Sequence, residues 1–282
     1  MRLALAVAVA VACSVGCHAV HYDPVDEIEF QAFPDARSAL AAVLMEAGPA
    51  KVYAVGEYHP TSKTANVKSP LAHFASMVDV IAPRARHVVL ESWVDDGCSA
   101  AKQVDAQIAA TIDRPAAGAK TMDAFLMKGA KQNLVAHGLS VTCLEQSTIL
   151  DQRGRVDFYS LLQLITEKLG EEAASFVSDD RAVIVYGGAL HNDLYPRWQL
   201  ESLSYAVDLD KKLGGGVVEI DLVVPEIIAP MSMVRSEAWF PLIGRSAPNV
   251  SMVWRRGPHS FVIILPAQST AVARIALPME HA

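Results

Sequence analysis

Short apolar runs alternate with helix-like segments through the middle of the 282-residue chain, and this alternation constrains the fold more than any other feature. The apolar runs cover residues 52–56, 87–90, 139–144, 182–186 and 217–224. Helical spacing of apolar residues occurs between them, at 39–45, 70–81, 99–112, 121–137 and 158–176. Uninterrupted apolar runs indicate strands that are buried on both faces, and their alternation with helices indicates parallel connections. We therefore expect an α/β fold with a mainly parallel central sheet flanked by helices.

The last part of the chain has a different pattern. Two strand-like runs, 251–254 and 261–265, flank the turn-forming sequence Arg255-Arg-Gly-Pro258. This pattern predicts an antiparallel C-terminal hairpin that completes the sheet. We expect residues 39–282 to form a single domain.

The N-terminus has the pattern of an export signal. Arg2 precedes a short apolar run and then small residues, ending in Gly16-Cys17. The run is shorter than the roughly 20 apolar residues that span a bilayer. Gly16-Cys17 resembles a bacterial lipobox, so we expect residues 1–17 to be a signal peptide and Cys17 to be lipidated. Cys13 is a second candidate, and an ordinary signal peptide with incidental cysteines is the alternative.

These features predict an exported envelope lipoprotein, held at the outer membrane by its lipid and facing the periplasm or the surface. Residues 18–38 are polar and are expected to form a tether. An oxidising periplasm would allow Cys98 and Cys143 to form a disulfide, although two separate buried thiols are the alternative. The net charge of −7 argues against nucleic acid as a partner.

Ionisable residues follow four of the apolar runs, where each predicted strand reaches its carboxyl end. Glu57 and His59 follow the first run and Glu91 the second, whereas Glu145 follows the third and His191 the fourth. Ligands of open α/β sheets bind outside the carboxyl ends of the strands. We therefore expect these side chains to converge, with Glu145 as the less certain member of the set.

Imidazole and carboxylate groups together suit a divalent ion such as zinc, manganese or cobalt. The expected metal ligands are His59, His191, Glu57 and Glu91, and either glutamate can act as a general base. The nearby glycines at 56, 187 and 188 are expected to allow sharp turns after the strands and to bring the backbone close to a ligand. Arg155 and Tyr159 open the long predicted helix and either face the crevice or lie in solvent.

Three of these segments together resemble a known superfamily. They are Val52-Tyr-Ala-Val-Gly-Glu-Tyr-His59, Val88-Val-Leu-Glu91 and Val183-Ile-Val-Tyr-Gly-Gly-Ala-Leu-His191. Their two Gly-x-x-His motifs and the intervening glutamate resemble the superfamily of TraB, Tiki proteases, erythromycin esterases and ChaN haem-binding lipoproteins. The Gly-Glu-x-His form and the export signal are most similar to the ChaN branch. The resemblance covers about residues 50–225, and Pro60 departs from the aspartate that is common in ChaN.

The resemblance implies one of two activities. The ChaN branch implies haem binding and iron uptake, with an outer-membrane haem receptor as partner, and Tyr58 and Tyr186 then become candidate haem ligands beside His59, His191 and Arg155. The Tiki and esterase branches imply a metal-dependent hydrolase of peptide, ester or amide bonds. The function expected first is therefore an envelope lipoprotein that binds haem or a metal ion. A metal-dependent hydrolase is the alternative, and a non-catalytic envelope scaffold is the second alternative.

Overall fold

The computed structural model describes residues 28–94, 107, 118–178 and 180–269. The predicted signal peptide, Cys17, Cys98 and most of the helix predicted at 99–112 lie outside these residues. The described residues form one eight-stranded sheet in the order β1-β7-β8-β6-β2-β5-β3-β4. The strands are β1 (Gln31–Phe33), β2 (Val52–Glu57), β3 (Ala85–Val94), β4 (Val135–Ser140), β5 (Ala182–Gly188), β6 (Val217–Val223), β7 (Ser251–Gly257) and β8 (Ser260–Ile264). Six of them form the parallel part, whereas β1–β7 and β7–β8 pair antiparallel.

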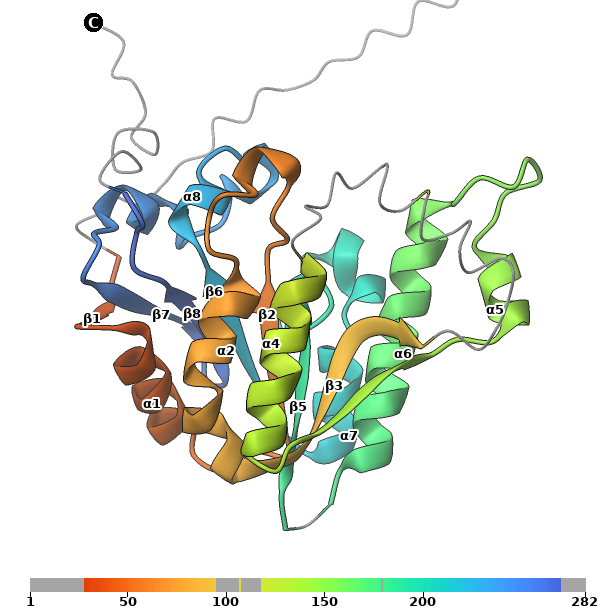
Figure 1. Cartoon of the computed structure of the whole chain (residues 1–282), viewed down its shortest axis with the longest axis horizontal. Helices are drawn as coiled ribbons and strands as arrows, with labels where there is room; N and C mark the ends of the chain where they lie inside the picture. Colours follow the sequence, from red (N-terminus) through yellow and green to blue (C-terminus); the bar gives the residue numbers. More distant parts are fainter. Residues whose placement is uncertain (1–27, 95–106, 108–117, 179, 270–282) are drawn as a thin grey trace, which may run out of the picture.

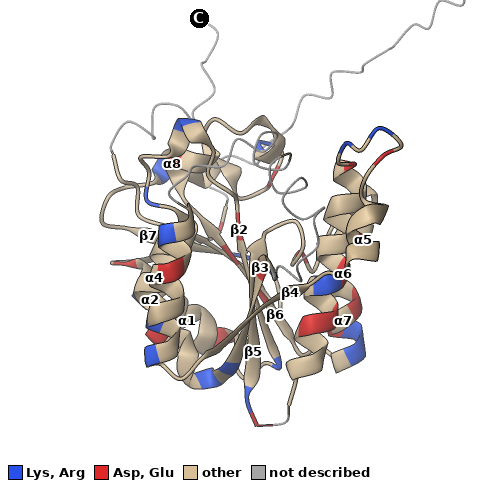
Figure 2. Cartoon of the chain, turned by 45° about the vertical axis from the view of Figure 1, so that its right-hand side comes forward, with Lys and Arg blue, Asp and Glu red and all other residues tan. Residues whose placement is uncertain are grey.

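Helices cover both faces of this sheet (Figure 1). The α-helices are α1 (Ala36–Ala47), α2 (Pro70–Ile81), α4 (Gly118–Lys131), α5 (Cys143–Thr148), α6 (Phe158–Phe176), α7 (Ala206–Leu213) and α8 (Pro225–Ile228). Helices α1, α2 and α4 lie on one side of the sheet, whereas α6 and α7 lie on the other (Figure 2). Strand residues alternate between the two cores: Tyr53 and Val55 pack under α1 and α2, whereas Val52 and Ala54 pack under α6 and α7. The α/β class and the C-terminal hairpin predicted from the sequence are thus confirmed.

The predicted bounds of the two strongest helices match the structure because both have clear start signals. Helix α2 begins after Ser69, whose hydroxyl accepts a hydrogen bond from the Ala72 N–H, and Pro70 occupies its first position. Helix α6 begins after Asp157, whose carboxylate accepts from the Ser160 N–H. Each cap satisfies a backbone donor that the helix itself leaves without a partner.

Two predicted boundaries are wrong. Residues 31–38 are not a tether, because β1 pairs with β7, some 220 positions away, and Asp35 caps α1. The strand predicted at 139–144 lies earlier, at β4, because α4 ends at Lys131 and Asn133 adopts a left-handed conformation with φ 62°. A three-residue edge strand has no periodicity to detect, and the turn at Asn133 lies inside an apparently continuous helical pattern.

Glu145 is therefore not at the carboxyl end of a strand. It lies in the first turn of α5, where its carboxylate accepts hydrogen bonds from the Thr142 N–H and hydroxyl while its own N–H donates to Thr142 Oγ1. This reciprocal arrangement is a capping box. The same carboxylate pairs with Lys168 at 2.6 Å. Glu145 thus stabilises a helix start and is removed from the set of site residues.

Two further observations bear on export without testing it. Cys143 is disulfide-bonded, as expected for an oxidising compartment, and its predicted partner Cys98 lies outside the described residues. In the part of the chain that the structure describes, no helix has the length and apolar character needed to cross a membrane.

A histidine pair at the far end of β3 and β4 is expected to make stability depend on pH. His87 Nδ1 lies 2.9 Å from His137 Nε2, and both rings stack on Phe176. Burial lowers the pKa of each histidine from its ordinary value of 6.5. The folded state then binds fewer protons than the unfolded state, so the free energy of unfolding falls as pH decreases below about 6.5.

Urea unfolding at about pH 7.5 and about pH 5 checks this expectation. The His87→Gln/His137→Gln variant should lose less stability between the two conditions than the native chain. An equal loss in both proteins would show that other groups cause the dependence.

Candidate active or metal site

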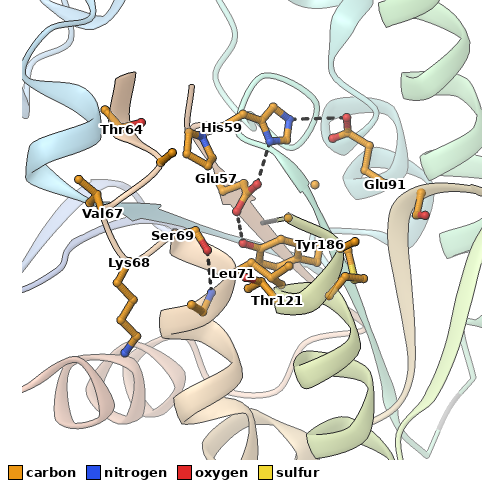
Figure 3. A pocket seen from close by; sticks show the side chains of 18 of the residues that line it. Glu57, His59, Thr64, Val67, Lys68, Ser69, Leu71, Glu91, Thr121 and Tyr186 are labelled. Atoms are coloured by element: carbon orange, nitrogen blue, oxygen red, sulfur yellow. Dashed lines mark hydrogen bonds and ion pairs between the residues drawn. The ribbon is translucent and has the colours of Figure 1, made fainter. Parts of the chain in front are cut away.

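The four residues Glu57, His59, Glu91 and His191 meet at the carboxyl edge of three adjacent strands. Strand β5 lies between β2 and β3, and Glu57 is in register with Gly188. The three strands end at the same edge because they are parallel, which brings together residues that lie up to 134 positions apart in the sequence. Figure 3 shows Glu57, His59, Glu91 and Tyr186 gathered on one wall of a cavity.

His59 lies between two carboxylates. Its Nδ1 is 2.8 Å from Glu57 Oε1, and its Nε2 is 3.6 Å from Glu91 Oε1. The other oxygen of Glu57 accepts a hydrogen bond from the Tyr186 hydroxyl, and Glu91 Oε2 accepts one from the Gly188 N–H at 2.6 Å. Both oxygens of Glu57 are therefore engaged, so this residue holds the His59 ring in place. Glu91 is the carboxylate that faces the Nε2 side of the ring.

The charges of this group reinforce one another. Burial by itself would lower the pKa of His59, but the Glu91 carboxylate and the hydrogen bonds to Glu57 and Glu91 raise it to about 10. Burial would raise the pKa of Glu91, whereas the His59 charge and the contacts with His59, His191 and Gly188 hold it at about 2. In the protein by itself, His59 and Glu91 thus form a charged pair at neutral pH.

His191 is held in one tautomer. Its Nδ1 lies 3.2 Å from the Leu203 carbonyl oxygen, which can only accept, so this nitrogen carries the proton. Thr166 Oγ1 lies 2.7 Å from the same nitrogen and 2.8 Å from the Leu162 carbonyl oxygen, so the hydroxyl accepts from His191 and donates to Leu162. Burial lowers the pKa of His191, which keeps the ring neutral. Its Nε2 carries a lone pair and has no hydrogen-bond partner among the described residues.

The glycines at this edge provide space for neighbouring side chains, and the sharp turns predicted for them are not present. Gly56, Gly187 and Gly188 lie within strands and none has a positive φ. A side chain on Gly188 would start 3.3 Å from His59 Nε2 and 3.5 Å from His191 Cδ2. A side chain on Gly56 would start 2.2 Å from an oxygen of Asp221. Glycine is needed because polar side chains from neighbouring strands occupy these positions.

Substitution of Gly56 by alanine is therefore expected to destabilise the fold. The added methyl group overlaps Asp221 and Asn192, and overpacking of this kind costs about 1–3 kcal/mol. Gly118→Ala is the matched control, because its methyl group would meet nothing within 4 Å. Chemical denaturation of both variants checks the expectation, and equal midpoints would contradict it.

Two cavities open beside the site. His59, Glu57 and Glu91 line both of them, whereas His191 lines the larger. The smaller has a volume of about 520 Å³ and the larger about 670 Å³. Small-molecule sites commonly occupy about 300–1,000 Å³. The larger cavity has many apolar wall residues, among them Phe158, Leu161, Leu162, Ile165, Met231 and Trp239.

The other predicted site residues have different positions. Tyr58 lines the larger cavity and Tyr186 the smaller, but burial raises the pKa of both phenols well above 10, which opposes the phenolate form that binds haem iron. Arg155 lies away from the group: its exposed guanidinium pairs with Asp151 at 2.7 Å, and neither cavity is lined by it. Tyr159 is exposed and shares a hydrogen bond with Ser202.

Two kinds of residue at this site were not indicated by the sequence pattern. Thr166 lies in a helix and acts only through His191. Asp221, Asn192 and Trp239 surround or line the larger cavity from distant segments. The one available signal was the pair Glu219 and Asp221 inside the otherwise apolar run 217–224, because a carboxylate in a buried strand requires an explanation.

The donor set can be compared with what a metal ion requires. Among the described residues, no group of three or more His, Cys, Asp or Glu side chains is already arranged to hold an ion. Two ligands about 2.1 Å from a tetrahedral ion lie roughly 3.4 Å apart, close to the 3.6 Å between His59 Nε2 and Glu91 Oε1. Each histidine also has an acceptor at Nδ1, as metal-binding histidines almost always do. These residues fit a divalent ion if the His191 ring and Glu91 move closer together.

The fold and the site define a class: an α/β protein with a two-histidine, two-glutamate group at the carboxyl edge of its sheet. No family model matches the chain, and no curated protein matches it. A solved structure described as the type III effector HopBA1 is similar, with a TM-score of 0.41 and 13% sequence identity. That alignment covers 87% of this chain and 100% of the other. A similarity this low assigns neither a family nor an activity.

Proposed function

We propose that this chain is a metal-dependent hydrolase that cleaves an ester, amide or peptide bond of a small molecule. The observation that carries the proposal is the matched orientation of two histidines around Glu91. Each ring has its Nδ1 engaged with an oxygen, Glu57 Oε1 for His59 and the Leu203 carbonyl for His191. His191 Nε2 then offers a lone pair, and His59 Nε2 would offer one on losing its proton, so that both could share a ligand with Glu91.

The chemistry divides between the ion and the chain. A bound divalent ion would polarise the substrate carbonyl and make water a better nucleophile. Glu57 and Tyr186 hold the His59 ring, and Thr166 with the Leu203 carbonyl holds the His191 ring. Glu91 is the carboxylate placed for both ion binding and proton transfer, while the Gly188 N–H fixes one of its oxygens. The two cavities would accommodate the parts of the substrate on either side of the scissile bond.

Haem binding is the second candidate, supported by one observation. The larger cavity has apolar walls and His191 lines it, so this ring would be the candidate nitrogen ligand of a planar apolar cofactor. The raised pKa values of Tyr58 and Tyr186 weigh against a tyrosinate ligand. The buried Glu91 carboxylate suits a small divalent ion better than an apolar macrocycle, and binding of the ion would release the proton of His59.

Metal binding by the purified full chain tests the proposal. Calorimetric titration with zinc, manganese and cobalt should give one site per chain, and the His59→Ala/His191→Ala variant should lose it. His87→Ala/His137→Ala is the matched control, because it removes two histidines from the same sheet at a distance from the site. Hydrolysis of a panel of aryl esters and amides should require the metal and stop in chelator.

Two outcomes would redirect the assignment. A saturable Soret band with haemin, lost in the His59→Ala/His191→Ala variant and without metal binding, would establish the haem candidate. Absence of both ligands from the native chain would favour the scaffold alternative.

We also propose that the protein is exported and anchored through Cys17. A Cys17→Ala variant produced in a Gram-negative host should move from the membrane fraction to the periplasm. An unchanged fractionation would contradict lipidation at this residue.

A further inference from the structure

One buried carboxylate at the larger cavity has no role in the group just described. Asp221 lies in β6, is 5% exposed, and lines the cavity that His191 also lines. The described part of the chain gives it one hydrogen bond, from Asn192 Nδ2 at 3.3 Å, and no ion pair. A buried carboxylate without a cation is unfavourable, so its position calls for a partner.

The two arginines that line the cavity are paired with other carboxylates, and Arg256 acts on Asp221 only through its charge. Arg256 pairs with Asp193 at 2.7 Å and donates to the Tyr195 carbonyl oxygen, whereas Arg197 pairs with Glu237 at 2.8 Å. Each arginine thus has its own carboxylate. Burial raises the pKa of Asp221 well above its ordinary value, and the nearby carboxylates of Glu219 and Asp193 raise it further. Without a ligand the protonated form is therefore favoured, and a cation from outside the chain would replace that proton.

Two aromatic rings lie on the wall of the same cavity. Tyr58 and Trp239 have ring centroids 5.9 Å apart and planes inclined by 55°, and both residues line the cavity with Asp221. Asp221 in β6 is in register with Gly56 of β2, two positions before Tyr58, so the two residues lie beside each other across neighbouring strands. Inclined aromatic rings beside a carboxylate are the arrangement that recognises protonated or quaternary amines.

We propose that Tyr58, Trp239 and Asp221 form a subsite for a positively charged amine of the ligand. On binding, the proton of Asp221 passes to solvent, and the amine pairs with the carboxylate and lies against the faces of the two rings. The His59, Glu91 and His191 group lies at the same cavity. The substrate of the proposed hydrolase would therefore carry a cationic amine, in the part of the molecule that enters the larger cavity. This last assignment rests on the proposed function, whereas the subsite itself does not.

A pair of isosteric probes separates charge from shape. Choline and 3,3-dimethyl-1-butanol have similar shapes, but only choline is charged. Titrations of the full chain, followed by ligand-observed NMR in chelator, should give a dissociation constant at least about tenfold lower for choline. The Asp221→Asn and Trp239→Leu variants should each reduce this preference to about threefold or less. Asp208→Asn, a change to an exposed acid on α7, is the control and should keep it.

Titrations of the native chain are enough to contradict the inference, so it remains testable even if a variant fails to fold. Equal affinity for the two probes, or binding of neither, would exclude an amine subsite. A preference that persists in a folded Asp221→Asn variant would exclude Asp221 as its basis. Because chelator is present throughout, these results are independent of the metal titration that tests the hydrolase.

Discussion

Replacement of Glu91 by glutamine is expected to abolish metal-dependent hydrolysis and to weaken zinc binding more than any other single isosteric change. Glu91 faces His59 Nε2 at 3.6 Å, and its charge acts on both histidines. Glutamine keeps the shape but removes the negative charge, and it cannot accept a proton. Loss of a positioned proton acceptor typically costs about 10²–10⁴-fold in rate. We expect kcat/KM to fall by at least that range and the zinc dissociation constant to rise by more than about 100-fold.

Glu57→Gln provides the comparison for this prediction. Glu57 touches the His59 ring through Nδ1 and not through the side that faces Glu91, so it is a positioning residue. Such residues typically change metal affinity by about 10- to 100-fold. The zinc dissociation constant should therefore rise less in Glu57→Gln than in Glu91→Gln. The reverse order would show that the two glutamates have been assigned to the wrong roles.

Replacement of Phe74 by alanine is expected to cause the largest loss of stability. Its side chain is fully buried, and its ring stacks on Phe125 at 5.5 Å and on Tyr186 at 5.2 Å. Removing a buried phenylalanine ring costs about 3–5 kcal/mol through lost burial and the cavity left behind. Because the Tyr186 hydroxyl donates to Glu57, the loosened ring should also weaken zinc binding. Denaturant unfolding and zinc titration measure the two effects.

Two further variants test whether the loss of stability comes from the buried ring of Phe74. Phe74→Leu refills much of the space and should recover part of the lost stability. Met45→Ala removes a large apolar side chain of α1 that is 77% exposed, so it should change the free energy of unfolding by less than about 0.5 kcal/mol. A similar loss in Met45→Ala and Phe74→Ala would contradict the assignment of Phe74 to the core.

Sequence pattern predicted the elements whose signals are local. The strand β2, the helices α2 and α6 and the C-terminal hairpin were predicted because apolar periodicity and helix caps are written in consecutive residues. The same local logic failed where a distant partner decides the structure. Strand β1 forms only because β7 lies beside it, and β4 is displaced by the left-handed turn at Asn133.

The candidate site divides in the same way. The sequence by itself determined which ionisable residues lie at or near the carboxyl ends of the parallel strands, although β3 continues past Glu91 to Val94. The geometry of parallel strands then brings Glu57, His59, Glu91 and His191 to one edge. Only the tertiary structure decided their roles, because these depend on contacts between segments far apart in the chain. It separated the positioning glutamate from the one beside both histidines, assigned Glu145 to a helix cap, and placed Asp221 against the larger cavity. Hydrogen-bond partners and burial belong to the packed molecule, and no run of consecutive residues contains them.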